Sequence, residues 1–206
     1  RTTEEIRLRE GPIPSYHKVG KWSWNSYAPY LMIDFKQGLS EGKDIVYIAC
    51  SSALSASVNM AKMNMYVHGV SEHELANDDT LNAPYFHEGT TLKQFDYVVA
   101  NPPFSLKSWR KAALMNDTYE RWGTVRTNRE TGKQEIDLVM PPEKCGDYAF
   151  LLHVLKSMKD GDGRGACILP HGVLFRGNAE ADIRKWIVEH KFIEGIIGLP
   201  ANLFFG

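Results

Sequence analysis

The sequence predicts an α/β domain built on a mostly parallel sheet that helices cover on both faces. Short apolar runs typical of buried strands recur along the chain, and stretches with helical periodicity separate them. The helical stretches are roughly ten to fifteen residues long, which favours strand–helix–strand units over hairpins. Ligands bind such sheets at the carboxyl ends of the strands. Residues that directly follow a strand are therefore the first candidates for function.

The first predicted strand is "DIVYIAC", residues 44–50. After it, apolar residues recur from Leu54 to Met65 at i, i+4, i+7 and i+11. This spacing predicts an amphipathic helix that closes near Gly69. The polar string "NDDTLNAP", residues 77–84, is typical of a turn.

The second predicted strand is "FDYVVA", residues 95–100. A polar stretch from 116 to 144 follows, longer than an ordinary connection, and such loops are usually functional or mobile. The string "GDYAFLLHVLKSMKDG", residues 146–161, predicts a helix, with Asp147 near its start and Gly161 beyond its end. A strand, a helix and a strand are then predicted at 163–170, 178–191 and 192–200.

The composition is that of an ordinary globular protein, with 43% hydrophobic and 24% charged residues in 206. No apolar run reaches the length of a membrane span, and we expect no leader and no membrane contact. The cysteines Cys50, Cys145 and Cys167 lie far apart, which indicates reduced, structural thiols and a cytoplasmic location. We expect a segment of uncertain role at 1–43, in which "APYLMIDFKQGL" is compatible with a short helix, and a domain at 44–206.

The net charge of −1 bears on nucleic-acid binding. A protein that grips DNA alone usually carries a clear basic excess. If DNA is the partner, either the basic residues are concentrated locally or another subunit supplies much of the contact. The local candidates, which could equally be a solvated surface, are Lys107, Arg110, Lys111, Arg121, Arg126 and Arg129.

The string "FDYVVANPPFSLKSW", residues 95–109, carries the clearest chemical signal. Proline cannot donate to a sheet ladder and fixes φ, so the strand must stop at Asn101. The Asn101 carboxamide and the Pro102 carbonyl then offer two rigid acceptors. Such acceptors suit methylation of an exocyclic amino group on a base. The lone pair of this amino group is delocalised into the ring, and accepting hydrogen bonds from its N–H groups shifts electron density back to nitrogen. Phe104 can stack on a base flipped out of a duplex.

By itself, N-P-P is also an ordinary loop opening. Its place at the end of a buried strand in an α/β pattern favours the functional interpretation.

His171, in "LPHGVLF", invites a role as base or metal ligand. Methyl transfer needs no strong base, and no other ligand stands at metal-binding spacing. We therefore expect no metal site and interpret His171 as loop structure near the target base.

Several strings, in the same order along the chain, resemble successive motifs of the DNA-methyltransferase subunit of type I restriction–modification systems. They are "ANPPFSLKSW", "GDYAFLLHVLKSMK", "ILPHGVLFRGNAEADIRKWIVE" and "IEGIIGLPANLFFG", and the resemblance runs from about Val58 to Gly206. That family methylates N6 of adenine in double-stranded DNA with S-adenosylmethionine. The resemblance implies a Rossmann-like methyltransferase fold, with 44–206 as part of the catalytic domain. It also implies assembly with a specificity subunit and a restriction subunit.

The resemblance assigns roles position by position. Asn101, Pro102, Pro103 and Phe104 match the catalytic motif [DNS]-P-P-[FYW], and Asn101 is also expected beside the cofactor. Asp79, in "NDDTL", falls where the family has the acid of "GDTL", near the cofactor's adenine. Turn chemistry alone is an equal explanation for Asp79.

The glycine-rich cofactor loop of the family has a weaker counterpart, "YIACSSALS" at 47–55, in which Ala49, Cys50 and Ser52 align. Ala49 is thus a cofactor-binding candidate. Tyr47 replaces the acid, and Ser51, Ala53 and Leu54 replace glycines that permit positive φ and close approach. Missing residues, a start inside a longer protein, or a degenerate cofactor half would each explain this. We favour an incomplete chain.

Three functions follow. The first is a site-specific adenine-N6 DNA methyltransferase subunit, or a part of one. The alternative is a catalytically inactive binding or assembly module that keeps the fold but lacks the cofactor loop. Methylation of a protein glutamine or an RNA base through the same motif is a third, less favoured because the strings after residue 146 resemble the DNA enzymes.

Overall fold

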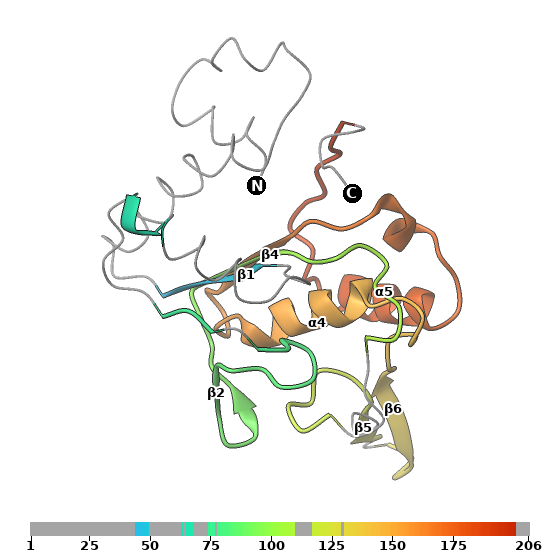
Figure 1. Cartoon of the computed structure of the whole chain (residues 1–206). Coiled ribbons are helices and arrows are strands. Elements are labelled where there is room, and N and C mark those ends of the chain that lie inside the picture. Colours follow the sequence, from blue (N-terminus) through green and yellow to red (C-terminus); the bar gives the residue numbers. More distant parts are fainter. Residues whose placement is uncertain are drawn as a thin grey trace.

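Three parallel strands form the central sheet of the computed structural model, in the order β1–β4–β7 (Figure 1). They are β1 (Ile45–Ala49), β4 (Tyr97–Asn101) and β7 (Arg164–Cys167). β4 is the middle strand and hydrogen-bonds both neighbours. The strands predicted at 44–50, 95–100 and 163–170 are thereby confirmed, as is their parallel direction.

The structure describes residues 44–49, 63, 65–67, 74–76, 78–109, 117–128 and 130–200. The segment 1–43, the short helix considered within it and the residues after Ala49 that align with the glycine-rich loop lie outside this range. So does most of the helix predicted after the first strand. Helical backbone at Met63 and at 65–67 agrees with that helix where it is described.

Helix α4 (Asp147–Ser157) packs along one face of the sheet (Figure 1). Val98 and Ala100 of β4 are almost fully buried, and Val154 of α4 packs against them. β-branched and small residues at these positions let a helix approach the pleated surface closely. The cluster also includes Val46 and Phe95. This packing fixes β4 and therefore the position of the residue at its end.

A second core lies between α4, α5 (Ala179–Glu189) and the segments that flank them. Ile183 and Ile187 of α5 are buried there, four residues apart and therefore on one face of the helix. Their partners include Tyr148, Leu152, Trp109, Trp122 and Leu138. The two tryptophans come from the loop after β4 and from the polar stretch, so this core ties both segments to α4. Helices predicted at 146–161 and 178–191 are confirmed.

The polar stretch predicted as a long loop contains an antiparallel hairpin, β5 (Thr124–Thr127) paired with β6 (Gln134–Leu138). Its turn is held by the Asn128 side chain, whose Oδ1 accepts from the backbone N–H groups of Glu130 and Thr131. A second antiparallel pair of strands, each two residues long, was also not predicted: β2 (His87–Glu88) with β3 (Thr91–Leu92). In both cases the strands are too short and polar for a clear period-2 signal.

The strand predicted at 192–200 is wrong. These residues have no regular secondary structure and are exposed along their whole length. Apolar, β-branched residues favour a strand, but a strand also needs a ladder partner, and no described strand pairs with this segment. Within the described ranges, no helix is both long and apolar enough to span a bilayer.

Candidate active site

The end of β4 places Asn101 at the carboxyl edge of the sheet. Its register neighbour is Ala49 on β1, while β7 extends only as far as Cys167, opposite Ala100. Two of the residues predicted from sequence, Ala49 and Asn101, therefore lie side by side on adjacent strands. Asn101 is partly exposed, and no described residue hydrogen-bonds its carboxamide. The carboxamide is therefore available to a ligand.

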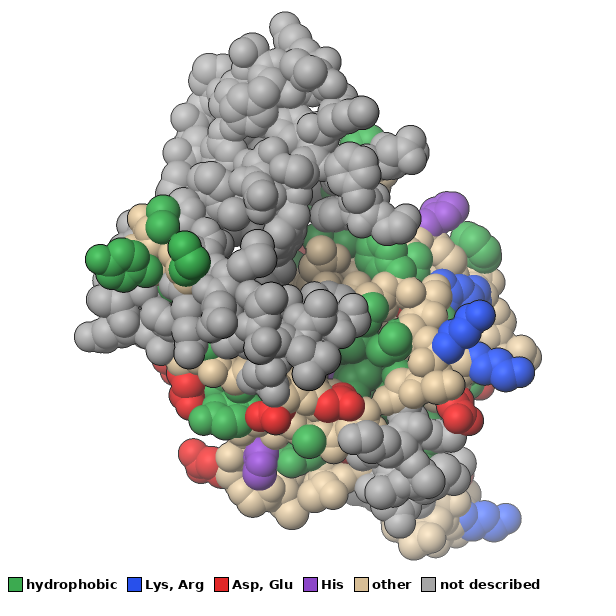
Figure 2. All heavy atoms as spheres, viewed as in Figure 1, with side chains coloured by type: hydrophobic (Ala, Val, Ile, Leu, Met, Phe, Trp, Pro, Cys, Tyr) green, Lys and Arg blue, Asp and Glu red, His purple; other side chains and the backbone are tan. Residues whose placement is uncertain are grey.

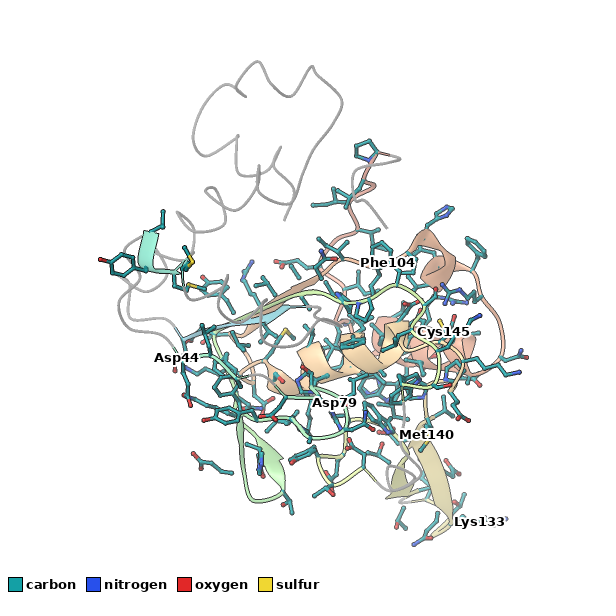
Figure 3. All side chains as sticks on the ribbon, in the orientation of Figure 1. Asp44, Asp79, Phe104, Lys133, Met140 and Cys145 are labelled. Carbon is teal, nitrogen blue, oxygen red and sulfur yellow. The ribbon has the colours of Figure 1, made fainter. Side chains whose placement is uncertain are left out.

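The two prolines and Phe104 continue the chain away from the sheet. Pro102 is buried and Pro103 partly buried, so the corner is packed as well as conformationally restricted. Phe104 is 46% exposed, which leaves a ring face open to solvent. Figure 3 shows Phe104 at the opposite end of the sheet from Asp44, which precedes β1. Rigid acceptors and an exposed aromatic ring thus occur together at one edge.

The loop after Phe104 has strained backbone at two positions. Ser105 and Ser108 have φ of 51° and 53°, which costs a residue other than glycine roughly 1 kcal/mol or more. Each is compensated by a hydrogen bond: Ser105 N–H donates to Asp147 Oδ1 at 2.7 Å and Ser108 N–H to the Glu143 carbonyl at 3.1 Å. The loop is thereby fixed to the segment that leads into α4.

Trp109 closes this loop. Its indole N–H donates to the Pro142 carbonyl at 2.9 Å, and its ring meets Trp122 edge-to-face with 5.2 Å between centroids. Gly146 lies against the ring, because a Cβ there would be 3.2 Å from the Trp109 Cδ1 and Cγ atoms. The absence of a side chain at Gly146 therefore allows the tryptophan to pack against the start of α4.

Asp79 lies in a turn, as its surrounding string predicted. Its Oδ1 accepts from the backbone N–H groups of Leu81 and Asn82 at 3.2 and 3.1 Å, and its Oδ2 accepts from Asn82 Nδ2 at 2.8 Å. The turn chemistry anticipated for Asp79 is thus present. The Asn82 amide also donates to the Trp109 carbonyl at 2.8 Å, which joins the Asp79 turn to the end of residues 101–109, the motif loop.

A buried ionic cluster that the sequence did not reveal lies behind the motif. The Asp147 carboxylate is fully buried, and Arg176 Nη1 is 2.9 Å from its Oδ2 and 3.0 Å from Glu180 Oε1. Burial acts against the Arg176 charge, but the bonds to Asp147 and Glu180 outweigh it and raise the pKa of this guanidinium. Sequence reasoning treated Asp147 only as a helix-start residue, and nothing local signals that its charge is buried.

The thiols behave as structural groups. Burial, followed by a hydrogen bond to Asp147, raises the pKa of Cys145 to about 11, and burial raises the pKa of Cys167 to about 12. Both therefore stay protonated near neutral pH, and both are free thiols. Cys167 packs at the edge of the sheet core, as expected for a small hydrophobe.

His171 begins a short 3₁₀ turn, η3 (His171–Leu174), directly after Pro170. It is exposed, and its ring meets Phe175 edge-to-face at 5.3 Å between centroids. In the part of the chain that the structure describes, no three His, Cys, Asp or Glu side chains come together as metal ligands. The loop interpretation of His171 agrees with this position.

Arg121 was one of the candidates for contact with DNA phosphates, and that assignment is wrong. The side chain is 2% exposed, and its guanidinium forms a buried ion pair with Asp117 at 2.8 Å. It also donates to the carbonyl of Leu81, beside the Asp79 turn. A basic residue counted from sequence is not necessarily on the surface. Lys107 is exposed, and the other four candidate side chains lie outside the described set.

Comparison with known proteins decides the family. The N-6 DNA methylase family matches residues 35–206, most of the chain. This chain is a member of the N-6 DNA methylase family.

Relatives of this methylase chain include the MjaVII and MjaIX methylase subunits of type I restriction enzymes from Methanocaldococcus jannaschii. These are 34% and 30% identical to it, each over 71% of the chain. The MpnII methylase subunit of Mycoplasma pneumoniae is 30% identical over the same share. The chain spans about a quarter of these relatives, 23% of each M. jannaschii subunit and 26% of the M. pneumoniae one. The resemblance to type I methylase subunits seen in the sequence is confirmed.

The fold class is confirmed by a solved structure. The crystal structure of a type I restriction–modification methyltransferase subunit from Streptococcus thermophilus superposes with a TM-score of 0.56 at 34% identity, covering 79% of this chain and 31% of that one. The three parallel strands and α4 are thus part of a Rossmann-like α/β methyltransferase fold.

Proposed function

We propose that this chain is part of the catalytic domain of a site-specific adenine-N6 DNA methyltransferase, the methylase subunit of a type I restriction–modification system. Its substrate is an adenine flipped out of double-stranded DNA, and its methyl donor is S-adenosylmethionine. Family membership supports a DNA methylase in general. The adenine chemistry is supported by a single arrangement: the Asn101 carboxamide at the end of β4, which no described residue hydrogen-bonds, next to the buried Pro102 and the exposed Phe104.

In the proposed mechanism, Asn101 Oδ1 and the Pro102 carbonyl each accept one N6–H of the target adenine. Two acceptors on one amine favour a tetrahedral nitrogen, which makes its lone pair available for attack. S-Adenosylmethionine, when bound, supplies an electrophilic methyl group on a sulfonium sulfur. The same oxygens would hold the N6 protons while the C–N bond forms and the sulfonium C–S bond breaks with its electron pair left on sulfur, and one N6 proton would then leave to solvent. Phe104 stacks on the base and orients it.

The residues expected to hold the cofactor fit such a molecule. Ala49 and Asn101 lie together at the carboxyl edge of a parallel sheet, where such folds bind nucleotides. Asp79 is exposed and uses three acceptor positions within its turn, which leaves its carboxylate able to accept one more bond, from a ribose or an adenine. The link through Asn82 holds this turn next to the motif loop.

Recognition of the DNA sequence is assigned to a specificity subunit, with a restriction subunit as the further partner. The net charge of −1 supports this division, because the chain has no overall basic excess for a stable grip on DNA. Figure 2 shows Lys and Arg side chains gathered toward one edge of the face in view, with hydrophobic side chains beside them. In this proposal, exposed basic side chains contact DNA phosphates locally. The free, protonated thiols support a cytoplasmic location.

The test is Asn101→Ala in the full-length methylase subunit, assembled with its specificity subunit. We expect methyl transfer from labelled S-adenosylmethionine to duplex DNA to fall about a hundredfold or more. The melting temperature should not change, since no described residue hydrogen-bonds this side chain. Asn101→Asp, which keeps an acceptor and is allowed by the motif, should retain part of the activity. A normal rate for Asn101→Ala would refute the proposal.

The second candidate is a catalytically inactive binding or assembly module. The observation that favours it is the replacement of loop glycines by Ser51, Ala53 and Leu54. Calorimetric titration of the full-length protein with S-adenosylmethionine separates the two. Absence of binding by a protein with a normal cooperative unfolding transition supports the module, and micromolar binding supports the enzyme.

A further inference from the structure

A fully buried carboxylate lies directly behind the catalytic motif. Asp147 occupies the first turn of α4, with 0% of its surface exposed. Carboxylates are almost never buried to this extent unless hydrogen bonds and opposite charges compensate for the lost hydration. The partners of Asp147 therefore indicate what this position is for.

These partners come from three separate segments of the chain. The Ser105 N–H donates to Oδ1 at 2.7 Å, and the Ser105 hydroxyl lies 3.4 Å from Oδ2. The Cys145 thiol donates to Oδ2 at 3.1 Å, and Arg176 Nη1 donates to the same oxygen at 2.9 Å. Charge-assisted bonds of this kind are stronger than those between neutral groups. One carboxylate thus joins the motif loop, the start of α4 and the segment after β7.

The contact with Ser105 bears directly on the motif, because Ser105 follows Phe104 in the chain. Its φ of 51° is unfavourable for any residue except glycine. The Asp147 bond stabilises this conformation, and a neighbouring bond from Gly146 N–H to the Leu106 carbonyl at 3.0 Å keeps the loop against α4. Without the carboxylate, Ser105 would relax toward negative φ, and the direction of the chain at Phe104 would change.

Arg176 connects the same carboxylate to the turn that carries His171 and Phe175. The guanidinium lies over Gly172, where a Cβ would be 2.6 Å from its Nε atom. Arg184 donates to the carbonyls of Val173 and Arg176 at 3.0 Å each, which fixes the turn from the α5 side. Displacing Asp147 would therefore disturb both the motif loop at Ser105 and the turn that Arg176 contacts.

We propose that Asp147 is a positioning residue for methyl transfer: its buried carboxylate holds Ser105 in the left-handed conformation that sets the orientation of Asn101–Phe104. The inference rests on the proposed function. It assigns to Asp147 no contact with substrate or cofactor. Its effect on the reaction passes through the backbone of the motif loop.

Glu180 provides a matched control. It is 3% exposed and pairs with the same Arg176 Nη1 at 3.0 Å, yet no described contact joins it to the motif loop. Asp147→Asn and Glu180→Gln each remove one negative charge from the same cluster. If the cluster matters only for stability, the two variants should have similar effects on unfolding and on catalysis.

The experiment compares both variants in the full-length methylase subunit assembled with its specificity subunit. Single-turnover methyl transfer should fall roughly ten- to a hundredfold in Asp147→Asn and less than about threefold in Glu180→Gln. With 2-aminopurine at the target position, emission should differ from wild type only in Asp147→Asn, because stacking on Phe104 changes. Equal losses of rate in the two variants, or a normal rate in Asp147→Asn, would overturn the proposal.

A second pair of variants tests the Ser105–Asp147 contact by changing Ser105, its exposed partner. The result then does not depend on the folding of Asp147→Asn. Ser105→Gly keeps the N–H and accepts a φ of 51°, whereas Ser105→Pro removes the N–H and cannot adopt that φ. We expect a near-normal rate for the glycine variant and a loss of at least tenfold for the proline variant. Equal rates would overturn the positioning role. If Asn101→Ala is inactive while Asp147→Asn is normal, only this inference fails; if Asn101→Ala is active, the proposed function fails as well.

Discussion

Arg121 and His153 contact each other inside the protein, with Arg121 Nη1 3.1 Å from His153 Nδ1. Both side chains are buried, and the Arg121 guanidinium also pairs with Asp117 and lies 4.3 Å from the Trp122 ring centroid. A guanidinium has only donors, so His153 Nδ1 must be the acceptor and the imidazole carries its proton on Nε2. The fold therefore requires a neutral histidine at this position.

This requirement predicts a loss of stability in mild acid. Burial, and then the charge of Arg121, lowers the pKa of His153 to about 3, while in the unfolded chain it is about 6.5. The unfolded state therefore binds a proton that the folded state does not, and stability falls as the pH drops from about 6.5 toward 3. Between about pH 7.5 and about pH 5, this one residue should cost about 2 kcal/mol of the free energy of unfolding.

Urea unfolding of wild type and His153→Gln at these two pH values measures the effect. Glutamine offers Arg121 an oxygen acceptor but does not titrate, so the variant lacks this source of pH dependence. Other acid-sensitive groups act equally in both proteins and cancel in the comparison. Parallel curves of stability against pH for the two proteins would contradict a buried, neutral His153.

Some of the fold and site could be predicted because the signals are local. The run "YVVAN" specifies a buried strand, and the prolines after it stop the ladder, so the position of Asn101 followed from sequence. Periodicity likewise gave α4 and α5. The segment 192–200 has the same kind of apolar pattern but no partner among the described strands, and pairing is not a local property.

The buried charges were beyond sequence reasoning for the same reason. Asp147 is compensated by Arg176, 29 positions away, and Arg121 bonds the Leu81 carbonyl, 40 positions away. Taken alone, each is a charged residue of a type that usually lies on the protein surface. Only the fold reveals that their charges are paired inside, and this is why Arg121 was counted among the candidates for contact with DNA.

The contact between β7 and α4 predicts a severe effect of a small substitution. A Cβ at Gly165 would lie 2.7 Å from Met158 Sδ and 2.9 Å from Val154 Cγ1. Gly165→Ala must therefore push α4 away from the sheet or displace Met158, and overpacking of this kind costs about 1–3 kcal/mol. The free energy of unfolding in urea measures the loss.

Two variants make this result specific. Gly177→Ala introduces the same methyl group where no heavy atom lies within 4 Å, so its stability should change by less than about 0.5 kcal/mol. Adding Met158→Ala to Gly165→Ala should recover part of the loss by removing the sulfur. A neutral Gly165→Ala would show that β7 and α4 are packed less closely than the structure has them.

The bridge made by Asn82 predicts coupling between cofactor affinity and the motif loop. Its amide donates to Asp79 Oδ2 and to the Trp109 carbonyl, both at 2.8 Å, so one side chain joins the turn proposed to hold the cofactor to the end of the motif loop. Asn82→Ala removes both bonds and leaves the Asp79 turn free to separate from Trp109. Losing a bond to a charged acceptor corresponds to roughly a tenfold change or more. We therefore expect the Kd for S-adenosylmethionine to rise about tenfold in calorimetric titration of the full-length subunit.

Asn128→Ala is the control for this bridge, since the Asn128 side chain also holds a turn, at Glu130 and Thr131, but in the β5–β6 hairpin. It should leave the Kd unchanged although it too removes backbone-directed hydrogen bonds. Asn82→Asp should be worse than Asn82→Ala, because it places a second carboxylate against Asp79 and an acceptor against the Trp109 carbonyl. Equal affinities in Asn82→Ala and Asn128→Ala would mean that the Asp79 turn keeps its place without the bridge. Any contribution of Asp79 to cofactor affinity would then not depend on the Asn82 bridge.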